Sequence, residues 1–566
     1  MPGLALVLAL VLALGVVAGP GAMSRPALAQ EAGATTPWGD YLAARHAEQI
    51  DDLATAARLQ RHLLTLAPDN LSLLNSALVL SLSNGDHELA RDIAGRIVAT
   101  DQVDFVAPLV LAVAALADDD PRRAEAWLAQ LPDAGINRVV GPLVLAWTEA
   151  ANGDLEAAIR TVGALADDQN VPALSGLHFG LLLELSGDAA AAEAVYVRLL
   201  AELDRPPLRV VHALAALLSA SDRHDQAQDL MATYVAADEG RLVIGPAAAE
   251  YGGPDQFLPL APTAKDGVAE VLFDIAAALH DDNGSRQALP FLQLALMVRP
   301  DFDLALLLLA DIHETLGRWP DAAAAYERID GESGWSWLAR VRAAQIPFEL
   351  DRLHESEAAL RQLAKERPDS ADPWIALGDL FRRSDDFRRA ARAYEEGFNR
   401  LGALEQRHWR ILYVSAIAYE RSDEWSAAEA QFLQALEFVP EQPQIMNYLA
   451  YSWVDQGLEL DRALPMLTRA VELRPRDGYI LDSLGWVYYR LDDFDNAVLW
   501  LERAAALTPG DPTINDHLGD AYWQVGRLRE ARFQWRRALA FEPEPDVESA
   551  IQRKLRQGLD RANTGP

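Results

Sequence analysis

The sequence predicts an all-α protein, a superhelix of about fourteen stacked helical hairpins that is closed by a single C-terminal helix. Three observations predict this fold. Two stretches that begin at Gly478 and Pro512 agree with each other at a fixed offset of 34 residues. The same register continues backwards through most of the chain. No stretch shows the strict alternation of apolar and polar residues that marks a half-buried strand.

The first 29 residues read as a secretory signal peptide. Leu4–Val17 is an unbroken run of Leu, Ala, Val and Gly, too short for a membrane span of about 20 residues. Ala27-Leu28-Ala29 before Gln30 has the small-x-small form of a cleavage site. However, no Lys or Arg precedes the apolar run, which leaves open a true start upstream of Met1. The alternative is a cytosolic protein that starts at Met23. Residues 30–36 are expected to form a short disordered lead.

Residues 37–241 are predicted to form a first block of six degenerate repeat units. An alanine at or next to the twentieth position of each unit lets the second helix pack closely on the first. Gly85-Asp86, Gly153-Asp154 and Gly187-Asp188 predict the turns between paired helices. Only Pro68 ends a unit. The units begin near Pro37, Leu71, Phe105, Val139, Ala173 and Leu208.

Residues 242–268 are predicted to be a connecting loop. Four prolines and three glycines between Leu242 and Asp266 exclude a helix pair. A loop of this length inside an array is functional or a hinge. Because it carries Tyr251, Phe257, Leu258 and Leu260, we expect it to lie in the groove of the superhelix or to cross it.

Residues 269–545 are predicted to form a second block of eight units. Each has a small residue at its eighth position, where two helices would cross. Glycine within a helix costs roughly 1 kcal/mol relative to alanine, so Gly485 and Gly519 indicate especially close crossings. The unit from Trp337 departs from the pattern, with Pro347 inside its first helix and Ser356 in place of alanine. The units begin near Ala269, Asp303, Trp337, Ala371, Trp409, Pro443, Gly478 and Pro512.

Residues 546–566 are predicted to form a capping helix and a tail. Val547, Ile551, Leu555 and Leu559 recur at a spacing of four residues, which places them on one face of a helix. An array of repeats needs such a cap because each repeat buries its apolar face only against its neighbours.

Composition excludes several classes of function. The net charge of −34 argues against a nucleic-acid-binding protein, which needs a basic face. The absence of cysteine excludes disulfides, zinc–thiolate sites, a cysteine nucleophile and a lipidated N-terminal cysteine. We predict no membrane span, because the longest apolar run is the signal sequence.

No catalytic or metal-binding motif is found in the sequence. His280-Asp281-Asp282-Asn283-Gly284 resembles the start of a calcium loop but lacks its alternating acids and its glutamate. We interpret it, like Asp118–Asp120 and Asp492-Asp493, as a turn with helix-capping acids. Gly252-Gly253-Pro254 is not followed by the Gly-Lys-Ser/Thr of a phosphate loop. The sequence therefore predicts a protein that is not an enzyme and that has no cofactor.

A candidate binding face lies along the first helices of the last three units. Positions 2, 5, 9 and 12 of such a helix share a face about 100° from the core positions. Aromatic rings and carboxylates favour a basic partner segment. The alternative is that Trp486 and Tyr489 only pack between neighbouring helices. The face consists of Asn447, Tyr451, Asp482, Trp486, Tyr489, Asp516, Asp520 and Trp523.

The 34-residue unit, with its small eighth residue, its alanine and its closing proline, resembles the tetratricopeptide repeat (TPR). The resemblance implies a TPR-type α-solenoid whose concave groove binds peptides or proteins. The stretches NYLAYSWVDQGLELDRAL, DGYILDSLGWVYYRLDDFDNAV and DPTINDHLGDAYWQVGRLREARFQWRRAL further resemble bacterial envelope TPR proteins. One such protein is an outer-membrane lipoprotein adaptor of a C-terminal processing protease, although the lipidation cysteine is missing here.

This resemblance implies a non-catalytic scaffold or adaptor in the periplasm, which recruits partner proteins or peptides and delivers substrates to a protease. A cytosolic assembly or regulatory scaffold is the alternative. The sequence does not identify the partner or the oligomeric state.

Overall fold

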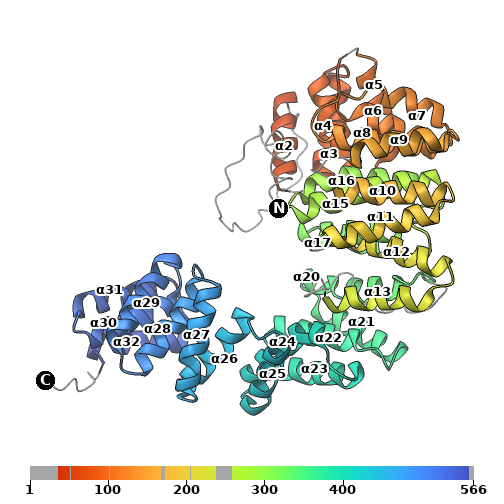
Figure 1. Ribbon diagram of the computed structural model, residues 1–566. Helices are drawn as coiled ribbons and strands as arrows, with labels where there is room; N and C mark the ends of the chain where they lie inside the picture. Colours follow the sequence, from red (N-terminus) through yellow and green to blue (C-terminus); the bar gives the residue numbers. More distant parts are fainter. Residues whose placement is uncertain are drawn as a thin grey trace. The chain divides into compact units, whose positions relative to one another are not determined.

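The computed structural model describes residues 36–50, 52–100, 102–166, 172–203, 206–237 and 258–559 (Figure 1). Within these ranges every regular element is a helix and none is a strand, so the predicted all-α class is confirmed. The predicted signal peptide, nearly all of the lead and most of the predicted loop lie outside the described residues. Among the described helices, none is both long enough and apolar enough to cross a bilayer.

Six helix pairs make up the first block, and their first helices begin within two residues of the predicted starts. The pairs are α2 (Pro37–Gln49) with α3 (Leu53–Leu66), α4 (Leu71–Ser83) with α5 (His87–Val98), α6 (Ala107–Ala117) with α7 (Pro121–Leu128), α8 (Asn137–Ala151) with α9 (Leu155–Ala166), α10 (Pro172–Leu185) with α11 (Ala189–Glu202), and α12 (Leu208–Ala220) with α13 (His224–Ala237).

The second block continues the pattern to the C-terminal helix. Its elements are α15 (Ala264–Asp281) with α16 (Ser285–Val298), α17 (Asp303–Thr315) with α18 (Trp319–Glu327), α19 (Ser336–Ala343) and α20 (Ile346–Glu349) with α21 (Leu353–Glu366), α22 (Asp372–Arg383) with α23 (Phe387–Leu401), the short η1 (Gln406–His408), α24 (Trp409–Arg421) with α25 (Trp425–Phe438), α26 (Pro443–Gln456) with α27 (Leu460–Leu473), α28 (Gly478–Arg490) with α29 (Phe494–Leu507), α30 (Pro512–Gln524) with α31 (Leu528–Ala540), and α32 (Pro545–Gln557).

The chain divides into two compact units, Met1–Ser356 and Glu357–Pro566. The division falls inside α21 and not at the predicted loop, because α15 and α16 pack against α4, α6, α8 and α10 of the first block. Helix α15 also begins at Ala264, so the last residues of the predicted loop are helical. The hydroxyl of Thr263 and the carboxylate of Asp266 form a capping box that fixes this start.

The small residues of the eighth position lie where the two helices of a pair cross, as predicted. Ala276, Ala310, Ala416 and Ala450 are fully buried. A Cβ atom placed on Gly485 would lie 2.6 Å from Cγ of Leu501, closer than real Cβ contacts. The register read from the sequence therefore marks the true helix crossings.

The turns inside the hairpins share one backbone feature. In most of them the second residue after the first helix takes a positive φ, which glycine accepts at no cost and Asp or Asn more readily than other residues. Examples are Gly85, Asp119 and Asn283, the last within the stretch predicted as a turn at 280–284. In several hairpins the carboxylate of the following aspartate then caps the second helix, as when Asp86 accepts from the backbone N–H of Leu89 at 3.3 Å.

The irregular ninth unit is explained by Pro347 and Ser356. The proline is the second residue of the short helix α20. A break at residues 344–345 separates α20 from α19. Ser356 is fully buried. Its hydroxyl accepts from the backbone N–H of Phe348 at 3.0 Å and donates to the carbonyl of Gln345 at 3.2 Å. Serine thus replaces alanine here because the broken helix leaves backbone groups that need hydrogen bonds.

Candidate peptide-binding face of the C-terminal repeats

The predicted binding residues lie on three first helices that pack in succession, α26, α28 and α30. Helix α26 carries Asn447 and Tyr451, α28 carries Asp482, Trp486 and Tyr489, and α30 carries Asp516, Asp520 and Trp523. The structure brings these residues together, but it divides them into a partly exposed cluster and a buried one.

The partly exposed cluster is aromatic. The ring of Trp486 stacks on Tyr489 with centroids 4.7 Å apart and on His517 with centroids 3.9 Å apart. The ring of Tyr451 lies 6.5 Å from that of His517. We name Tyr451, Trp486 and Tyr489 the aromatic cluster. Its three members are partly buried, so they are neither core residues nor fully exposed.

His517 was missed by the sequence analysis because it stands at the sixth position of its unit, outside the four positions assigned to the groove. Its Nδ1 atom lies 3.0 Å from Oδ2 of Asp482. Burial lowers the pKa of His517, but the carboxylates of Asp482, Asp516 and Asp520 outweigh it, so the pKa is raised above the usual value. The only signal in the sequence is a histidine where the preceding unit has Ser483.

Asp482 is buried against His517 and is only 5% exposed. The buried cluster consists of Asp516, Asp520 and Trp523, each likewise less than a tenth exposed. Helix α32 covers them. Nζ of Lys554 lies 2.7 Å from Oδ2 of both aspartates, and Nε1 of Trp523 donates to the carbonyl of Leu559 at 2.7 Å. The expectation that these three side chains belong to an exposed face is therefore wrong. The capping helix takes the place of a next repeat, and its lysine supplies the positive charge that was expected from a partner.

The apolar face of α32 is the one predicted. Ile551 is fully buried, and Val547, Leu555 and Leu559 pack against the core of the last repeats. The same helix also affects the pKa of Asp520 through Lys554. Burial and the neighbouring carboxylate of Asp516 raise the pKa of Asp520 to about 6, against the opposing effect of Lys554.

The part of the face around α26 and α28 has polar atoms without a partner. Nε1 of Trp486 and Oδ1 of Asn447 are buried and make no hydrogen bond within the described residues. Burial raises the pKa of the Tyr451 hydroxyl, and the charges of Asp482, Asp455, Asp511 and Glu420 raise it further. The aromatic cluster therefore lies in a negative field and can accept a cationic side chain over a ring face.

We expect the stability of the C-terminal repeats to decline as pH rises from about 4, where Asp520 begins to ionise in the unfolded chain, to above 6.5, where His517 loses its proton. A histidine whose pKa is raised by folding stabilises the fold below its unfolded pKa, and this stabilisation is lost as pH rises through the folded pKa. Asp520, raised to about 6, changes stability in the same direction at lower pH. The measurement is the thermal unfolding midpoint against pH for the wild type and His517→Gln. The variant should show a smaller decline, and an identical decline would contradict this origin.

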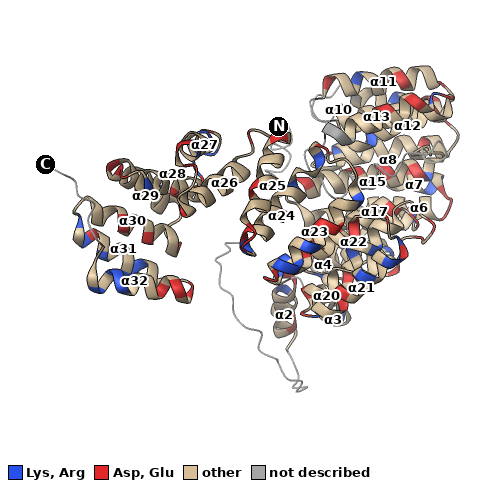
Figure 2. Cartoon of the chain, turned by 90° about the horizontal axis from the view of Figure 1, so that it is seen from below, with Lys and Arg blue, Asp and Glu red and all other residues tan. Residues whose placement is uncertain are grey.

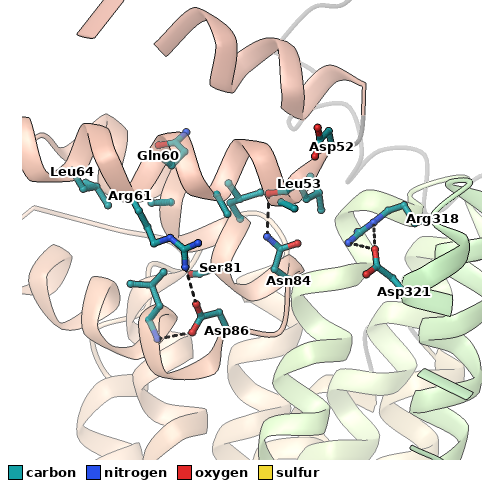
Figure 3. Close-up of a pocket in the computed structure, with 15 residues that line it drawn as sticks. Asp52, Leu53, Gln60, Arg61, Leu64, Ser81, Asn84, Asp86, Arg318 and Asp321 are labelled. Atoms are coloured by element: carbon teal, nitrogen blue, oxygen red, sulfur yellow. Dashed lines mark hydrogen bonds and ion pairs between the residues drawn. The ribbon is translucent and has the colours of Figure 1, made fainter. Parts of the chain in front are cut away.

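A cavity lies between α3, α4 and α18, in the compact unit Met1–Ser356 (Figure 3). It has a volume of about 420 Å³. Leu53, Ala57 and Leu80 are among its apolar lining residues. Four of its charged side chains form two ion pairs, Arg318 with Asp321 at 2.9 Å and Arg61 with Asp86 at 3.9 Å. Its only hydroxyl, that of Ser81, donates to the carbonyl of Leu78. The cavity thus contains no activated nucleophile or proton-transfer pair.

No group of three metal-binding side chains occurs within the described ranges. His280 and Asp281 end α15, and residues 282–284 form the turn to α16. His280 pairs with Asp311 at 3.0 Å and with the hydroxyl of Ser285 at 2.9 Å.

Three segments of the chain, residues 273–334, 375–443 and 449–512, match the tetratricopeptide repeat family. They make up less than half of the chain and fall on the helix pairs from α15 to α18 and from α22 to α29. These segments are tetratricopeptide repeats, and the last of them contains the aromatic cluster.

The TPR repeat-containing protein PA4667 of Pseudomonas aeruginosa is similar at 26% identity over 153 residues. The alignment covers 27% of this chain and 25% of that protein, so it spans a quarter of the relative's length.

Solved structures share the helical repeat. The Cut9–Hcn1 hetero-tetramer of the APC/C has 14% identity over 93% of this chain and 97% of that one, with a TM-score of 0.39. Yeast Tom70 has 14% identity over 80% and 95%, with a TM-score of 0.32. MamA of Desulfovibrio magneticus has 18% identity over 30% and 94%, with a TM-score of 0.27. These TM-scores are too low for the structures to bear on function.

Proposed function

We propose that the protein is a non-catalytic scaffold that binds a basic segment of a partner protein over the aromatic cluster of its C-terminal tetratricopeptide repeats. The observation that carries the proposal is the stack of Trp486, Tyr489 and His517 in a field of carboxylates, with Nε1 of Trp486 lacking a partner. A ring face beside carboxylates attracts an arginine or lysine side chain by about 0.5–2 kcal/mol.

The first block is a weaker candidate for such a groove. Its helices α4, α6, α8 and α10 are already packed against α15 and α16. The contacts include the fully buried His178 of α10, whose Nε2 atom lies 3.4 Å from Oδ2 of Asp274 in α15. A partner would have to displace this packing, whereas the aromatic cluster is partly exposed.

The binding test needs a partner obtained by affinity capture, which is then titrated against defined variants. Trp486→Ala should weaken binding about tenfold, the cost of losing roughly 1.4 kcal/mol. Trp500→Ala is the matched control, because Trp500 is a partly buried tryptophan on the second helix of the same pair. Asp455→Asn should slow association and flatten its salt dependence, because Asp455 is exposed and near Tyr451. Equal affinity for the wild type and Trp486→Ala would exclude this face.

We further propose that the scaffold acts in the bacterial envelope after export and recruits substrates to a periplasmic protease. The signal-like N-terminus and the resemblance of the last repeats to envelope TPR proteins support this role. N-terminal sequencing of the protein isolated from cells should give Gln30 as the first residue. An intact Met1 or Met23 would favour the cytosolic scaffold instead.

A further inference from the structure

The last hairpin carries a basic surface on a chain that is otherwise strongly acidic. One side of α31 packs into the core through Ala531, Trp535 and Ala538, all fully buried. The opposite side exposes Arg529, Arg532, Phe533 and Arg536, which share a helix face because they recur at spacings of three and four residues. Phe541 follows directly after the helix and is 39% exposed. We name these five residues the basic aromatic face.

The arginines of this face are not used inside the fold. Arg529, Arg532 and Arg536 form no ion pair or hydrogen bond with another described side chain, although Arg532 lies over the ring of Trp523. Elsewhere in the described chain many arginines are paired, as Arg527 is with Glu502 at 2.8 Å. Figure 2 shows the blue segments of α31 and α32 beside each other at this end of the chain. Three guanidinium groups are therefore available to an anionic surface.

Large apolar side chains project between these charges. Phe533 is 60% exposed and Leu499, at the equivalent position of the preceding repeat, is 51% exposed. Phe541 and Leu507 form a second pair at equivalent positions, with Leu507 43% exposed. The apolar side chains thus continue from α31 onto α29. Single exposed apolar residues need no explanation, but a repeated set beside unpaired arginines marks an interaction surface.

We infer that the basic aromatic face docks on the surface of an anionic phospholipid bilayer. Arginine forks bind phosphate groups in two-point geometry. Clusters of four to eight basic residues on a helix are typical of binding to anionic lipids, and Arg537 and Arg503 extend this cluster. Phenylalanine and leucine side chains insert at the boundary of head groups and acyl chains.

A bilayer suits the face better than an acidic protein does. An acidic protein would need a matching pocket for Phe533 and Leu499 in addition to its carboxylates, whereas a bilayer yields to projecting side chains. The net charge of −34 does not oppose this contact, since salt screens charges beyond about 8–10 Å. This surface is separate from the aromatic cluster, so the inference stands independently of the proposed partner.

The test is binding of the full chain to vesicles of phosphatidylglycerol and phosphatidylcholine, and to vesicles of phosphatidylcholine alone. The anionic vesicles should bind the chain, and the neutral ones should not. Replacing Arg529, Arg532 and Arg536 together with glutamine should weaken binding about 100-fold, at about fivefold for each arginine. Phe533→Ser should weaken it about tenfold with little change in salt dependence.

The control is a triple variant with the same change in charge, made at exposed arginines that also lack ion pairs: Arg122, Arg388 and Arg392. It should bind anionic vesicles within about threefold of the wild type. Equal loss in both triple variants would overturn the inference, because binding would then follow total charge. It is also overturned if the chain ignores anionic vesicles, or if polyglutamate binds to the face in their place.

Discussion

Leucine in place of Gly485 or Gly519 should unfold the C-terminal repeats. A Cβ on Gly519 would lie 2.5 Å from Cδ1 of Trp535, a fully buried tryptophan with little room to move. Indole Nε1 of Trp535 also donates to Asp520 at 2.8 Å, so shifting the ring would break a buried hydrogen bond. Overpacking typically costs about 1–3 kcal/mol and more where nothing can yield. Because each repeat is stabilised by its neighbours, the loss should spread to adjacent pairs.

The measurement is the thermal unfolding midpoint followed by circular dichroism, with hydrogen exchange to locate the melted helices. Gly95→Leu provides the control. Gly95 lies within the helix α5, and a Cβ placed on it would meet no atom within 4 Å. The control should keep or raise the midpoint, since leucine favours helix over glycine by roughly 0.8 kcal/mol. An unchanged midpoint in Gly485→Leu and Gly519→Leu would show that the crossings can open at little cost.

Much of this fold could be predicted because the repeat encodes it locally. The register of 34 residues located the first helices of all fourteen pairs found in the described chain, most of them within two residues. Each signal, such as the glycine at 519 or the acid at 493 that caps α29, acts within its own hairpin. The packing of α15 across the first block could not be predicted, because no periodic pattern records contacts between residues about 60 positions apart, such as Arg209 and Glu270.

The sequence predicted that the residues of the candidate site lie close together, but it did not predict which of them the chain itself would cover. The sequence analysis expected the aspartates at 516 and 520 to favour a basic segment of a partner, and in the structure both pair with a lysine. A sequence alone does not show whether the cation comes from a partner or from the same chain, and here Lys554 supplies it. The residues around Trp486 lie one repeat further from the end of the array. Trp486 and Tyr489 form no hydrogen bond with a described residue of the capping helix, and so they remain the candidate for binding a partner.

Breaking the buried ion pair of Arg209 and Glu270 should destabilise the compact unit Met1–Ser356 by a comparably large amount. Nε of Arg209 donates to Oε2 of Glu270 at 3.0 Å, and the side chains are only 8% and 0% exposed. Burial raises the pKa of Glu270, while Arg209 acts in the opposite direction. The pair joins α12 to α15, so it links the last helix pair of the first block to the first pair of the second.

Glu270→Leu or Arg209→Met should destabilise this unit by about 3–5 kcal/mol, because each leaves a charge buried without its partner. Arg299 lies 3.5 Å from Glu270 and can partly compensate in Arg209→Met, so Glu270→Leu should be the more damaging. The double variant should recover most of the stability, because apolar side chains of similar size often replace a buried pair at no cost. Unfolding midpoints are the readout, with hydrogen exchange of α12 and α15 to show that these helices separate first.

Arg223 and Glu193 provide the control pair, because they join the residue before α13 to α11 at 2.8 Å with side chains 38% and 32% exposed. Arg223→Met should cost less than about 1 kcal/mol, as exposed pairs do. The comparison separates burial from geometry, since both pairs have good hydrogen-bond distances and differ chiefly in their access to water. If Glu270→Leu cost no more than Arg223→Met, α15 would be held against the first block by apolar packing alone, and the ion pair would add only specificity.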